Sequence, residues 1–415
     1  MRIIILALAC CGLTACGGGD ATLRDGPWRA ALDLNGAELP FTWSVQRDPA
    51  KGIRLTLRNG QEAIQVDEVA LRGDSFHARM PLFDSEFIGV VNGDTAISGE
   101  WINHLKGDGY RVPFTALAGP LPRFTGACAE GSGAFAGHWE ARFSPGSADA
   151  YNAVGIFDAK PDGLVTGTFL TETGDYRYLE GAACGDTMRL SCFDGTHAFL
   201  FACALRGDSL VGRFWSGTHW QEPWVAVRNL DYRLRDPDSL TTLREGFDRV
   251  AFRFKDTEGV ERSPSDAEYQ GKPLIVHIMG SWCPNCVDET ALLAEMHAKY
   301  EPEGLRILAV AFEKHADESR AMGALRRFKK TLRVPYPVLY GGPAAKDQAA
   351  SRLPFLSRLM SYPTTLFIDR QGRVRRIRTG FYGPGTGAYY ERYKAQLDTF
   401  LRGLIDEPLP ATAAR

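Results

Sequence analysis

Two cysteines spaced three positions apart, between a buried strand and a helix, constrain this chain more than any other feature. The motif Cys283-Pro284-Asn285-Cys286 follows an apolar run at 274–279 and precedes a helix-like segment from 287 to about 300. The first turn of a helix carries unpaired N–H groups and the positive end of the helix dipole. Both stabilise a thiolate, so Cys283 is predicted to be a competent nucleophile. Cys286 lies one turn along, where it can form or resolve a disulfide.

A zinc site is the competing interpretation of the two cysteines. Structural zinc needs four ligands, usually from a second cysteine pair or a pair of histidines. His277, His297 and His315 lack that spacing. The position between strand and helix favours redox chemistry, so the sequence predicts neither a metal ion nor a cofactor.

The residues around the motif alternate between strand-like and helix-like patterns. Predicted strands are 250–254, 274–279, 305–312, 337–340, 365–368 and 374–379. Predicted helices are 265–269 (a single turn), 287–300, 317–332 and 389–405. This order indicates a mixed sheet covered by helices, in a domain spanning 247–405. The tail at 406–415 is predicted to be disordered.

Two basic or glycine-rich features of this domain have ordinary interpretations. Arg326, Arg327, Lys329 and Lys330 are predicted to form the solvated face of a helix, with contact to a membrane or partner as the alternative. The glycine-rich stretch 383–387 lacks Walker spacing and is predicted to be a loop that enters the last helix.

Residues 26–229 have the composition of an antiparallel β region. Residues 53–58 alternate strictly and end at Asn59-Gly60, which is a strong hairpin signal. Gly26-Pro27-Trp28 resembles Gly137-His138-Trp139, which suggests weak repeats at 26–117 and 134–229. Two such units predict a duplicated sandwich or barrel. A charged linker at 230–246 follows.

Two details of the β region stay open at this stage. The aromatic segment 215–224 either lines a ligand pocket or belongs to the core. The middle cysteines Cys128, Cys184, Cys192 and Cys203 allow three pairings, and some of them can be buried free thiols.

The N-terminus is typical of an export signal. Arg2 precedes an apolar run at 3–11, and Leu13-Thr14-Ala15-Cys16 resembles a bacterial lipobox. It implies a lipoprotein signal peptide at 1–15, lipidation of Cys16 and a tether at 16–25. A plain secretory signal is the alternative. Gly17, in place of Asp, favours the outer membrane over the inner one.

Composition excludes two classes of partner. No apolar run of about 18 residues is present, so a transmembrane helix is not expected. The formal net charge of −2 offers no electrostatic basis for binding nucleic acid.

The motif and two later features resemble a known family. Trp282 and the two cysteines after a buried strand, with Tyr362-Pro363-Thr364 before a later strand, resemble the thioredoxin-like fold. Glu289 and the exported context resemble the TlpA/ResA-type disulfide reductases. The resemblance covers about 247–405. Together with the loops at 174–181 and 380–387, the whole chain resembles a lipoprotein subfamily with an extra β-rich domain, for which the resemblance implies no function.

The resemblance implies a role for each residue that matches the motif. Cys283 would attack and Cys286 would resolve, so that the two form the redox disulfide. Pro363 would be a cis-proline facing the dithiol, with an ordinary trans bond as the alternative. Glu289 would tune the dithiol or relay protons, unless it is simply an exposed residue of the helix face. The supporting residues would be Trp282, which shields the site, together with Pro284 and Thr364.

The sequence therefore predicts a lipid-anchored thiol–disulfide oxidoreductase on the periplasmic side of the cell envelope. The family implies reduction of a disulfide-bearing protein, with electrons from a membrane thiol carrier, in cytochrome c biogenesis. The alternative is an anchored binding protein whose β region captures a ligand or protein while the dithiol senses redox state. A peroxidase is not favoured, because no Pro-x-x-x-Thr-x-x-Cys arrangement occurs.

Overall fold

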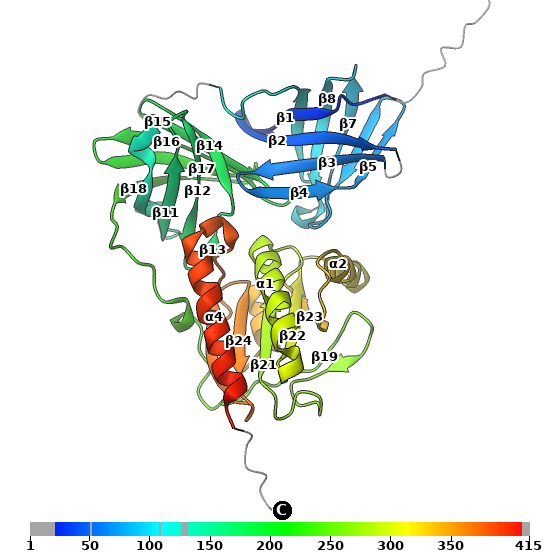
Figure 1. The fold of residues 1–415 in the computed structure, drawn as a ribbon, viewed down its shortest axis with the longest axis vertical. Helices are drawn as coiled ribbons and strands as arrows, with labels where there is room; N and C mark the ends of the chain where they lie inside the picture. Colours follow the sequence, from blue (N-terminus) through cyan, green and yellow to red (C-terminus); the bar gives the residue numbers. More distant parts are fainter. Residues whose placement is uncertain (1–20, 50–51, 108, 126–131, 409–415) are drawn as a thin grey trace, which may run out of the picture.

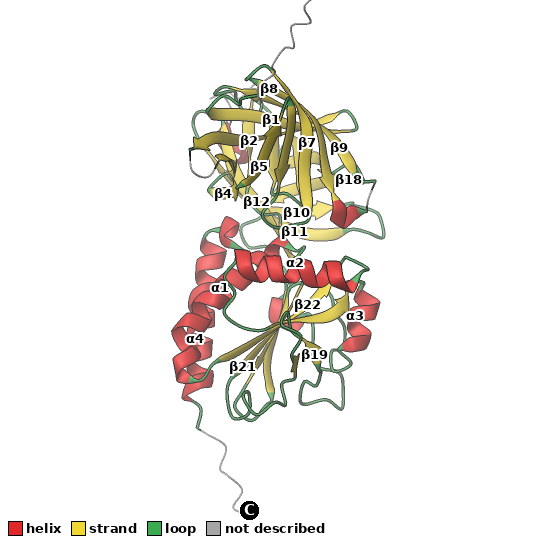
Figure 2. Ribbon diagram, turned by 90° about the vertical axis from the view of Figure 1, so that its right-hand side faces the viewer, coloured by secondary structure: helices red, strands yellow, loops and turns green. Residues whose placement is uncertain are grey.

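The computed structural model describes residues 21–49, 52–107, 109–125 and 132–408. They form two β-rich units that lie side by side, and an α/β domain that lies beneath both of them (Figures 1 and 2). The predicted order of an all-β antiparallel region followed by a thioredoxin-like domain is confirmed.

The first β unit is a nine-stranded antiparallel sheet with the order β4-β3-β2-β1-β9-β8-β7-β6-β5. Its strands are β1 (Gly26–Leu34), β2 (Ala37–Asp48), β3 (Gly52–Asn59), β4 (Glu62–Val66), β5 (Glu68–Arg72), β6 (Ser75–Arg79), β7 (Ser85–Asn92), β8 (Ala96–Asn103) and β9 (Arg111–Ala118). The sheet curls because β9 returns to pair with β1, which gives a barrel-like form. Its interior is aromatic, with Trp28, Trp43 and Trp101 at most 2% exposed.

The second β unit is also a nine-stranded antiparallel sheet, and it closes on itself. Its strands are β10 (Gly137–Phe143), β11 (Tyr151–Ala159), β12 (Leu164–Thr171), β13 (Gly174–Asp175), β14 (Leu179–Cys184), β15 (Thr187–Phe193), β16 (Ala198–Arg206), β17 (Ser209–Ser216) and β18 (Trp220–Arg228). β11 pairs with both β10 and β12, so the sheet forms a barrel without free edges along these strands. Phe193 of this unit stacks on Phe41 of the first with ring centroids 4.5 Å apart, so the two units share a core.

Both units begin with the same local arrangement. Gly26 and Gly137 have positive φ angles of 111° and 105°. Two residues later, the indole of Trp28 donates to the carbonyl of Arg24 at 2.8 Å, and that of Trp139 donates to the carbonyl of Phe135 at 2.9 Å. In each unit, the buried tryptophan thereby ties the segment before the first strand to the core.

The C-terminal domain contains a five-stranded mixed sheet with the order β23-β22-β21-β24-β25. Its strands are β21 (Leu274–Met279), β22 (Arg306–Glu313), β23 (Val338–Pro343), β24 (Thr364–Ile368) and β25 (Val374–Thr379), and a separate hairpin comprises β19 (Phe254–Lys255) and β20 (Glu261–Arg262). The helices are α1 (Pro284–Tyr300), α2 (Glu318–Thr331), α3 (Lys346–Arg352) and α4 (Ala388–Asp406). β21 is central and all of its residues are buried, which explains its uninterrupted apolar pattern.

Some local predictions were wrong. Residues 250–253 lie outside any strand, and only Phe254 and Lys255 enter the short β19. Residues 265–269 form turns instead of a helical turn, and α3 was not predicted. These segments are short and lie at the edge of the domain, where few residues are available to establish a periodic pattern. The loop at 383–387 enters α4 as predicted, through a 3₁₀ turn at Pro384–Thr386.

The middle cysteines differ in their bonding state. Cys184 is disulfide-bonded, whereas Cys192 and Cys203 are buried free thiols. Cys192 lies opposite Phe199 and Cys203 opposite Met188 in the sheet, so neither faces a cysteine. Cys128 and Cys16 lie outside the described residues. Among the described residues, no helix has the length and apolar character required to cross a membrane.

The β region packs directly on the α/β domain. Arg327 of α2 donates to the carbonyls of Met80 and Pro81, both at 2.9 Å, and pairs with Glu68 at 2.8 Å. The prediction of a fully solvated basic face on this helix is therefore wrong for Arg327. Figure 2 shows α2 lying beneath the strands of the β region.

Candidate functional site

The two motif cysteines lie at the connection between the central strand β21 and helix α1, at the N-terminal end of the helix. Cys283 is the N-cap residue of α1, and its sulfur accepts a hydrogen bond from the N–H of Cys286 at 3.3 Å. Pro284 occupies the first turn of the helix, where its missing N–H costs nothing. Both thiols are free, with Cys283 6% exposed and Cys286 fully buried. The outer thiol is thus Cys283 and the inner one is Cys286.

The environments of the two sulfurs favour different roles. Burial, followed by the contact with Cys283, raises the pKa of Cys286 well above its usual value. Cys283 instead sits on the N–H groups of a helix N-terminus, where negative charge is stabilised. This asymmetry suits Cys283 to attack and Cys286 to react second.

The loop before β24 faces the dithiol. The Tyr362–Pro363 peptide bond is cis, as the sequence predicted. The Cys283 sulfur lies 3.5 Å from the carbonyl oxygen of Tyr362, so the outer thiol touches the backbone beside Pro363. Thr364 is fully buried and donates to the carbonyl of Ser361 at 2.8 Å, which holds this loop in place.

Trp282 forms one wall of the site. Its indole donates to the carbonyl of Phe312 at 2.8 Å, and its ring lies edge-on to Tyr362 with centroids 5.4 Å apart. The ammonium of Lys314 lies 4.2 Å from the centre of the Trp282 ring. A positive charge over the indole face is favourable, and it lies close to the outer thiol.

Glu289 is buried beneath the dithiol, so the alternative of an exposed helix residue is wrong. It is 1% exposed and follows Cys286 by three residues, on the same side of α1. Its Oε2 accepts a hydrogen bond from Thr365 at 2.9 Å and lies 3.2 Å from Nε2 of His277. Its Oε1 has no hydrogen-bond partner among the described residues. The structure therefore brings a carboxylate, one oxygen of which is unpaired, close to the inner thiol.

A second buried carboxylate, which sequence reasoning missed, holds the turn before Cys283. Glu313 at the end of β22 accepts hydrogen bonds from the N–H and hydroxyl of Ser281, at 2.8 and 2.7 Å. Burial raises the pKa of Glu313 to about 7. The sequence offered no signal for this contact, because the two residues are 32 positions apart and meet only when β21 and β22 pair.

A loop of the second β unit covers the start of α1. Asn285 of the motif donates to the carbonyl of Phe381 at 3.2 Å and to that of Asp175 at 3.4 Å. Gly174 has a positive φ of 146°, and a Cβ there would lie 2.1 Å from the Asn285 amide, so only glycine permits this approach. The Asp175 carboxylate accepts from the N–H of Gly383 at 2.6 Å. The glycine-rich segments 174–181 and 380–387 therefore meet at the start of α1, beside the dithiol.

The same loop extends to the cis-proline. The hydroxyl of Ser361 donates to the carbonyl of Thr173 at 2.9 Å, and the hydroxyl of Tyr382 donates to the carbonyl of Thr171 at 2.9 Å. Access to Cys283 is consequently shaped by the β region as well as by the domain that carries the motif.

Arg177 links the three parts of the molecule. Its guanidinium forms ion pairs with Asp288 of α1, with Glu62 of the first unit at 2.5 Å, and with Asp194 of the second unit at 3.8 Å. Sequence reasoning missed the docking role of Asp288.

The structure thus brings together the residues that the sequence singled out: Trp282, Cys283, Pro284, Cys286, Glu289, Pro363 and Thr364. It adds Glu313, Lys314 and Arg177. No group of three or more His, Cys, Asp or Glu residues suitable for a metal ion occurs in the part of the chain that the structure describes. The arrangement is suited to two-electron exchange between a dithiol and a disulfide.

Comparison with known proteins finds similarity within this domain. The model of the AhpC/TSA family matches residues 248–377. The chain is 27% identical over 140 residues to the thiol-disulfide oxidoreductase ResA of Geobacillus thermodenitrificans, which covers 34% of this chain and 72% of that protein. It is 28% identical over 139 residues to ResA of Bacillus subtilis, covering 34% of this chain and 69% of that protein.

Among solved structures, a thiol:disulfide interchange protein of the thioredoxin family from Chlorobium tepidum is 19% identical. That match covers 40% of this chain and 99% of the other, with a TM-score of 0.30.

Proposed function

We propose that this chain, whose C-terminal domain is a TlpA/ResA-like thiol–disulfide oxidoreductase domain, reduces disulfides through Cys283 and Cys286. The observation that carries the proposal is the placement of the Cys283 sulfur. It caps helix α1, accepts the N–H of Cys286 at 3.3 Å and lies 3.5 Å from the carbonyl that precedes cis-Pro363. A substrate disulfide that approaches along the cis-proline loop would meet this sulfur first.

The reaction proceeds in two exchanges. The Cys283 thiolate attacks one sulfur of the substrate disulfide, which forms a mixed disulfide and releases the other substrate sulfur as a thiolate that takes up a proton. Cys286 then loses its proton and attacks the Cys283 sulfur. This step releases the second substrate thiolate and leaves a Cys283–Cys286 disulfide, so that two electrons have moved to the substrate.

In this proposal Glu289, which follows Cys286 by three residues on the same side of α1, accepts the proton of Cys286. Burial raises the pKa of this thiol, so its deprotonation needs assistance. The Oε1 oxygen of Glu289 has no other partner among the described residues. Glu289 thus acts at the second exchange rather than the first.

The test is turnover of a disulfide with a dithiol donor. The mature protein should reduce hydroxyethyl disulfide, and Cys283→Ser should abolish the activity. Cys286→Ala should retain the first exchange and accumulate a mixed disulfide through Cys283, whose partner mass spectrometry would identify. Unchanged turnover in Cys283→Ser would rule out the proposed function.

We also propose that the protein works in the cell envelope, attached to the membrane through a lipid on Cys16. The support is the lipobox-like segment 13–16 after an apolar run. An oxidising compartment makes regeneration of the dithiol dependent on imported electrons, for which a membrane thiol carrier is the proposed donor. Protein disulfides, including those of cytochrome c maturation, are the proposed substrates. Release of a Cys16→Ser variant from the membrane fraction would support the anchor, and retention would contradict it.

A second candidate function is ligand capture by the β region, with the dithiol as a redox sensor. It is favoured by a pocket of about 810 Å³ in the second unit, to which His219, Trp220 and Glu222 contribute. These residues belong to the aromatic segment 215–224. From the sequence, that segment was expected either to line a ligand pocket or to belong to the core. Met360, three residues before the cis-proline, also lines this pocket. Ligand binding that persists in Cys283→Ser, combined with no turnover in the native protein, would favour this function.

A further inference from the structure

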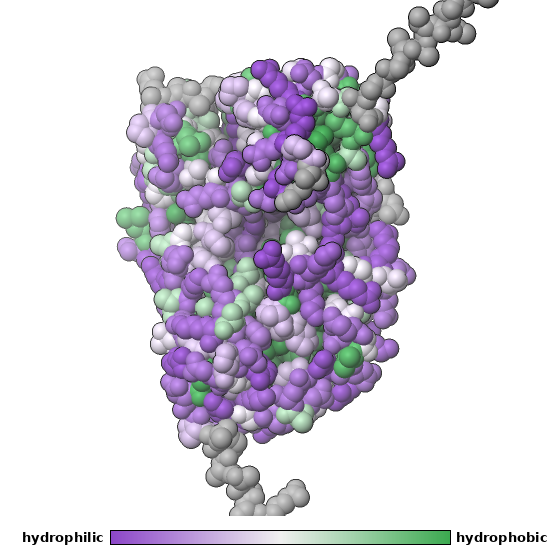
Figure 3. All heavy atoms as spheres, turned by 45° about the vertical axis from the view of Figure 1, so that its right-hand side comes forward, coloured by the Kyte–Doolittle hydropathy of each residue, from purple (hydrophilic) through white to green (hydrophobic). Residues whose placement is uncertain are grey.

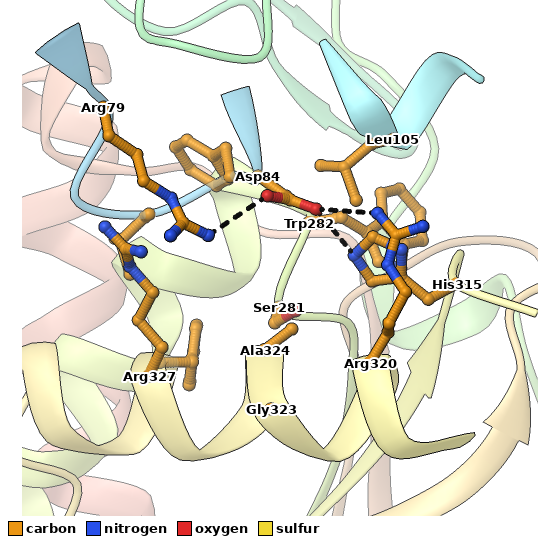
Figure 4. Close-up of a pocket in the computed structure, with 13 residues that line it drawn as sticks. Arg79, Asp84, Leu105, Ser281, Trp282, His315, Arg320, Gly323, Ala324 and Arg327 are labelled. Atoms are coloured by element: carbon orange, nitrogen blue, oxygen red, sulfur yellow. Dashed lines mark hydrogen bonds and ion pairs between the residues drawn. The ribbon is translucent and has the colours of Figure 1, made fainter. Parts of the chain in front are cut away.

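A second pocket lies between the first β unit and the α/β domain, directly beside the cysteine motif. It has a volume of about 350 Å³. Its floor includes Ser281 and Trp282, the two residues before the outer cysteine, and one side is formed by α2. The opposite side belongs to the first β unit and includes Arg79 and Asp84 (Figure 4). We call this space the interdomain cleft.

Cations outnumber carboxylates in the interdomain cleft. A single carboxylate, Asp84, is shared by Arg79 at 3.4 Å, Arg320 at 3.4 Å and the ring of His315 at 3.3 Å (Figure 4). The side chains of Arg79 and Arg320 are 43% and 53% exposed, so their charges are open to an entering molecule. One carboxylate cannot neutralise two guanidinium groups.

Two lysines beside the interdomain cleft add to this positive charge, one from each domain. Lys314 lies over the Trp282 ring, as described above. Lys106, in the 3₁₀ turn His104–Lys106 of the first β unit, lies 3.2 Å from the ring nitrogens of His219. Among the described residues, neither lysine has a carboxylate within 4.0 Å. Desolvation and the charge of Lys314 lower the pKa of Lys106 to about 8, so it still carries its proton at neutral pH.

The cleft has the position that a substrate needs. Cys283 is only 6% exposed, and the cleft lies beside Ser281 and Trp282, the two residues that precede it. Figure 3 shows a predominantly hydrophilic face, on which hydrophobic residues form only small separate patches. The cleft itself combines its charged groups with an apolar lining that includes Leu82, Leu105 and Phe328, so charge there adds selectivity to apolar contact.

We propose that the β region supplies the second wall of the substrate site, and that the interdomain cleft selects disulfides flanked by carboxylates. This inference rests on the proposed function and names the substrate class for the same site. Arg79, Arg320, Lys106 and Lys314 would hold the carboxylates while the disulfide reaches Cys283. Small acidic disulfides and acidic polypeptide segments share this chemistry.

The test compares disulfides of different charge with the full mature chain. Oxidised glutathione is anionic, hydroxyethyl disulfide is neutral and cystamine is cationic. We expect kcat/KM to be roughly tenfold higher for oxidised glutathione than for cystamine at low salt, and the ratio to fall as salt rises. A second arm uses two disulfide-linked peptides of equal length, with aspartates or lysines beside the cysteines.

Variants of the cleft locate the effect. Arg79→Gln and Arg320→Gln should each lower the ratio of kcat/KM for oxidised glutathione over hydroxyethyl disulfide by about threefold. Arg320→Lys should restore it. Lys330→Gln, an exposed lysine on the same helix outside the cleft, should leave the ratio unchanged. Because the ratio compares two substrates on one protein preparation, partial misfolding does not change it.

Each outcome decides the matter. A preference for oxidised glutathione, for the acidic peptide or for both supports charge selection and identifies the source of the carboxylates. Reduction of hydroxyethyl disulfide without such a preference, or with a preference that the cleft variants do not alter, overturns charge selection alone. No reduction of any disulfide overturns the proposed function and this inference with it.

Discussion

Arg177 of the second β unit forms an ion pair with Asp288 in the helix that begins at the dithiol. The two residues are 111 positions apart in the sequence. Their side chains are 6% and 14% exposed, so the pair is largely removed from water. The β region is therefore held against the active-site helix by a specific charged contact.

Removal of the Arg177 charge should destabilise the protein strongly. Arg177→Met leaves Glu62, Asp194 and Asp288 without their shared cation, and uncompensated buried carboxylates are costly. We expect the free energy of unfolding to fall by about 3–5 kcal/mol, as measured by urea denaturation. The matched control is Arg206→Met, which breaks an ion pair with Asp186 whose side chains are 63% and 56% exposed and should cost at most about 1 kcal/mol. Equal losses in the two variants would contradict the importance of the buried contact.

The free thiols should differ sharply in reactivity. Burial raises the pKa of Cys192, Cys203 and Cys286, to about 12 in the case of Cys203, whereas the sulfur of Cys283 caps a helix N-terminus, where negative charge is stabilised. With limiting iodoacetamide at pH 7.5, we expect Cys283 of the reduced protein to be alkylated at least about tenfold faster than the other three. Peptide mass spectrometry measures the labelling. Cys192 and Cys203 should react only after unfolding, and first labelling of Cys286 would reverse the assigned order of attack.

Glu313 should make stability depend on pH. Burial raises the pKa of this carboxyl from its ordinary value of 4.5 to about 7 in the folded protein. The folded state therefore binds the proton more tightly, and this contribution is fully present below about pH 4.5 and is lost as pH rises through 7. The loss amounts to about 3 kcal/mol at most.

Glu313→Gln, which can still hydrogen-bond to Ser281, should flatten the decline in unfolding free energy between pH 4.5 and 7. Urea denaturation at several pH values measures this. Glu100→Gln, a change at an exposed ion pair, is the control and should keep the slope. A slope that Glu313→Gln leaves intact would show that other groups cause it.

Glu289 should affect the second exchange more than the first. If Glu289 accepts the proton of Cys286 as proposed, Glu289→Gln removes that acceptor, and we expect the resolving step to slow by roughly 10²-fold. The mixed disulfide should then accumulate, while the rate of its formation through Cys283 changes little. Rapid acid quench and mass spectrometry follow both steps. Glu295→Gln, at an exposed position of the same helix, serves as the control, and equal slowing of both steps would indicate a purely structural role for Glu289.

Local patterns were sufficient for much of the dithiol itself. An uninterrupted apolar strand and a cysteine pair at a helix start carry their signal within a few neighbouring residues, so Cys283 and Cys286 could be placed from the chain alone. Pro363 was identified through the family resemblance of its Tyr-Pro-Thr segment. Glu289 was identified, but its burial was not, because an acidic residue in a helix has the same appearance in sequence whether it faces solvent or the core.

The sequence by itself thus determined the cysteine motif between a buried strand and a helix, and the order of a β region before an α/β domain. Only the tertiary structure decided what surrounds that motif. Arg177 reaches Asp288, Glu313 reaches Ser281, and Arg79 shares Asp84 with Arg320 across the interdomain cleft. These contacts join segments far apart in the chain, and a charged residue carries no mark of its distant partner. The interdomain cleft beside Cys283 likewise exists only in the tertiary structure, because its lining residues come from distant segments of the chain that belong to two domains.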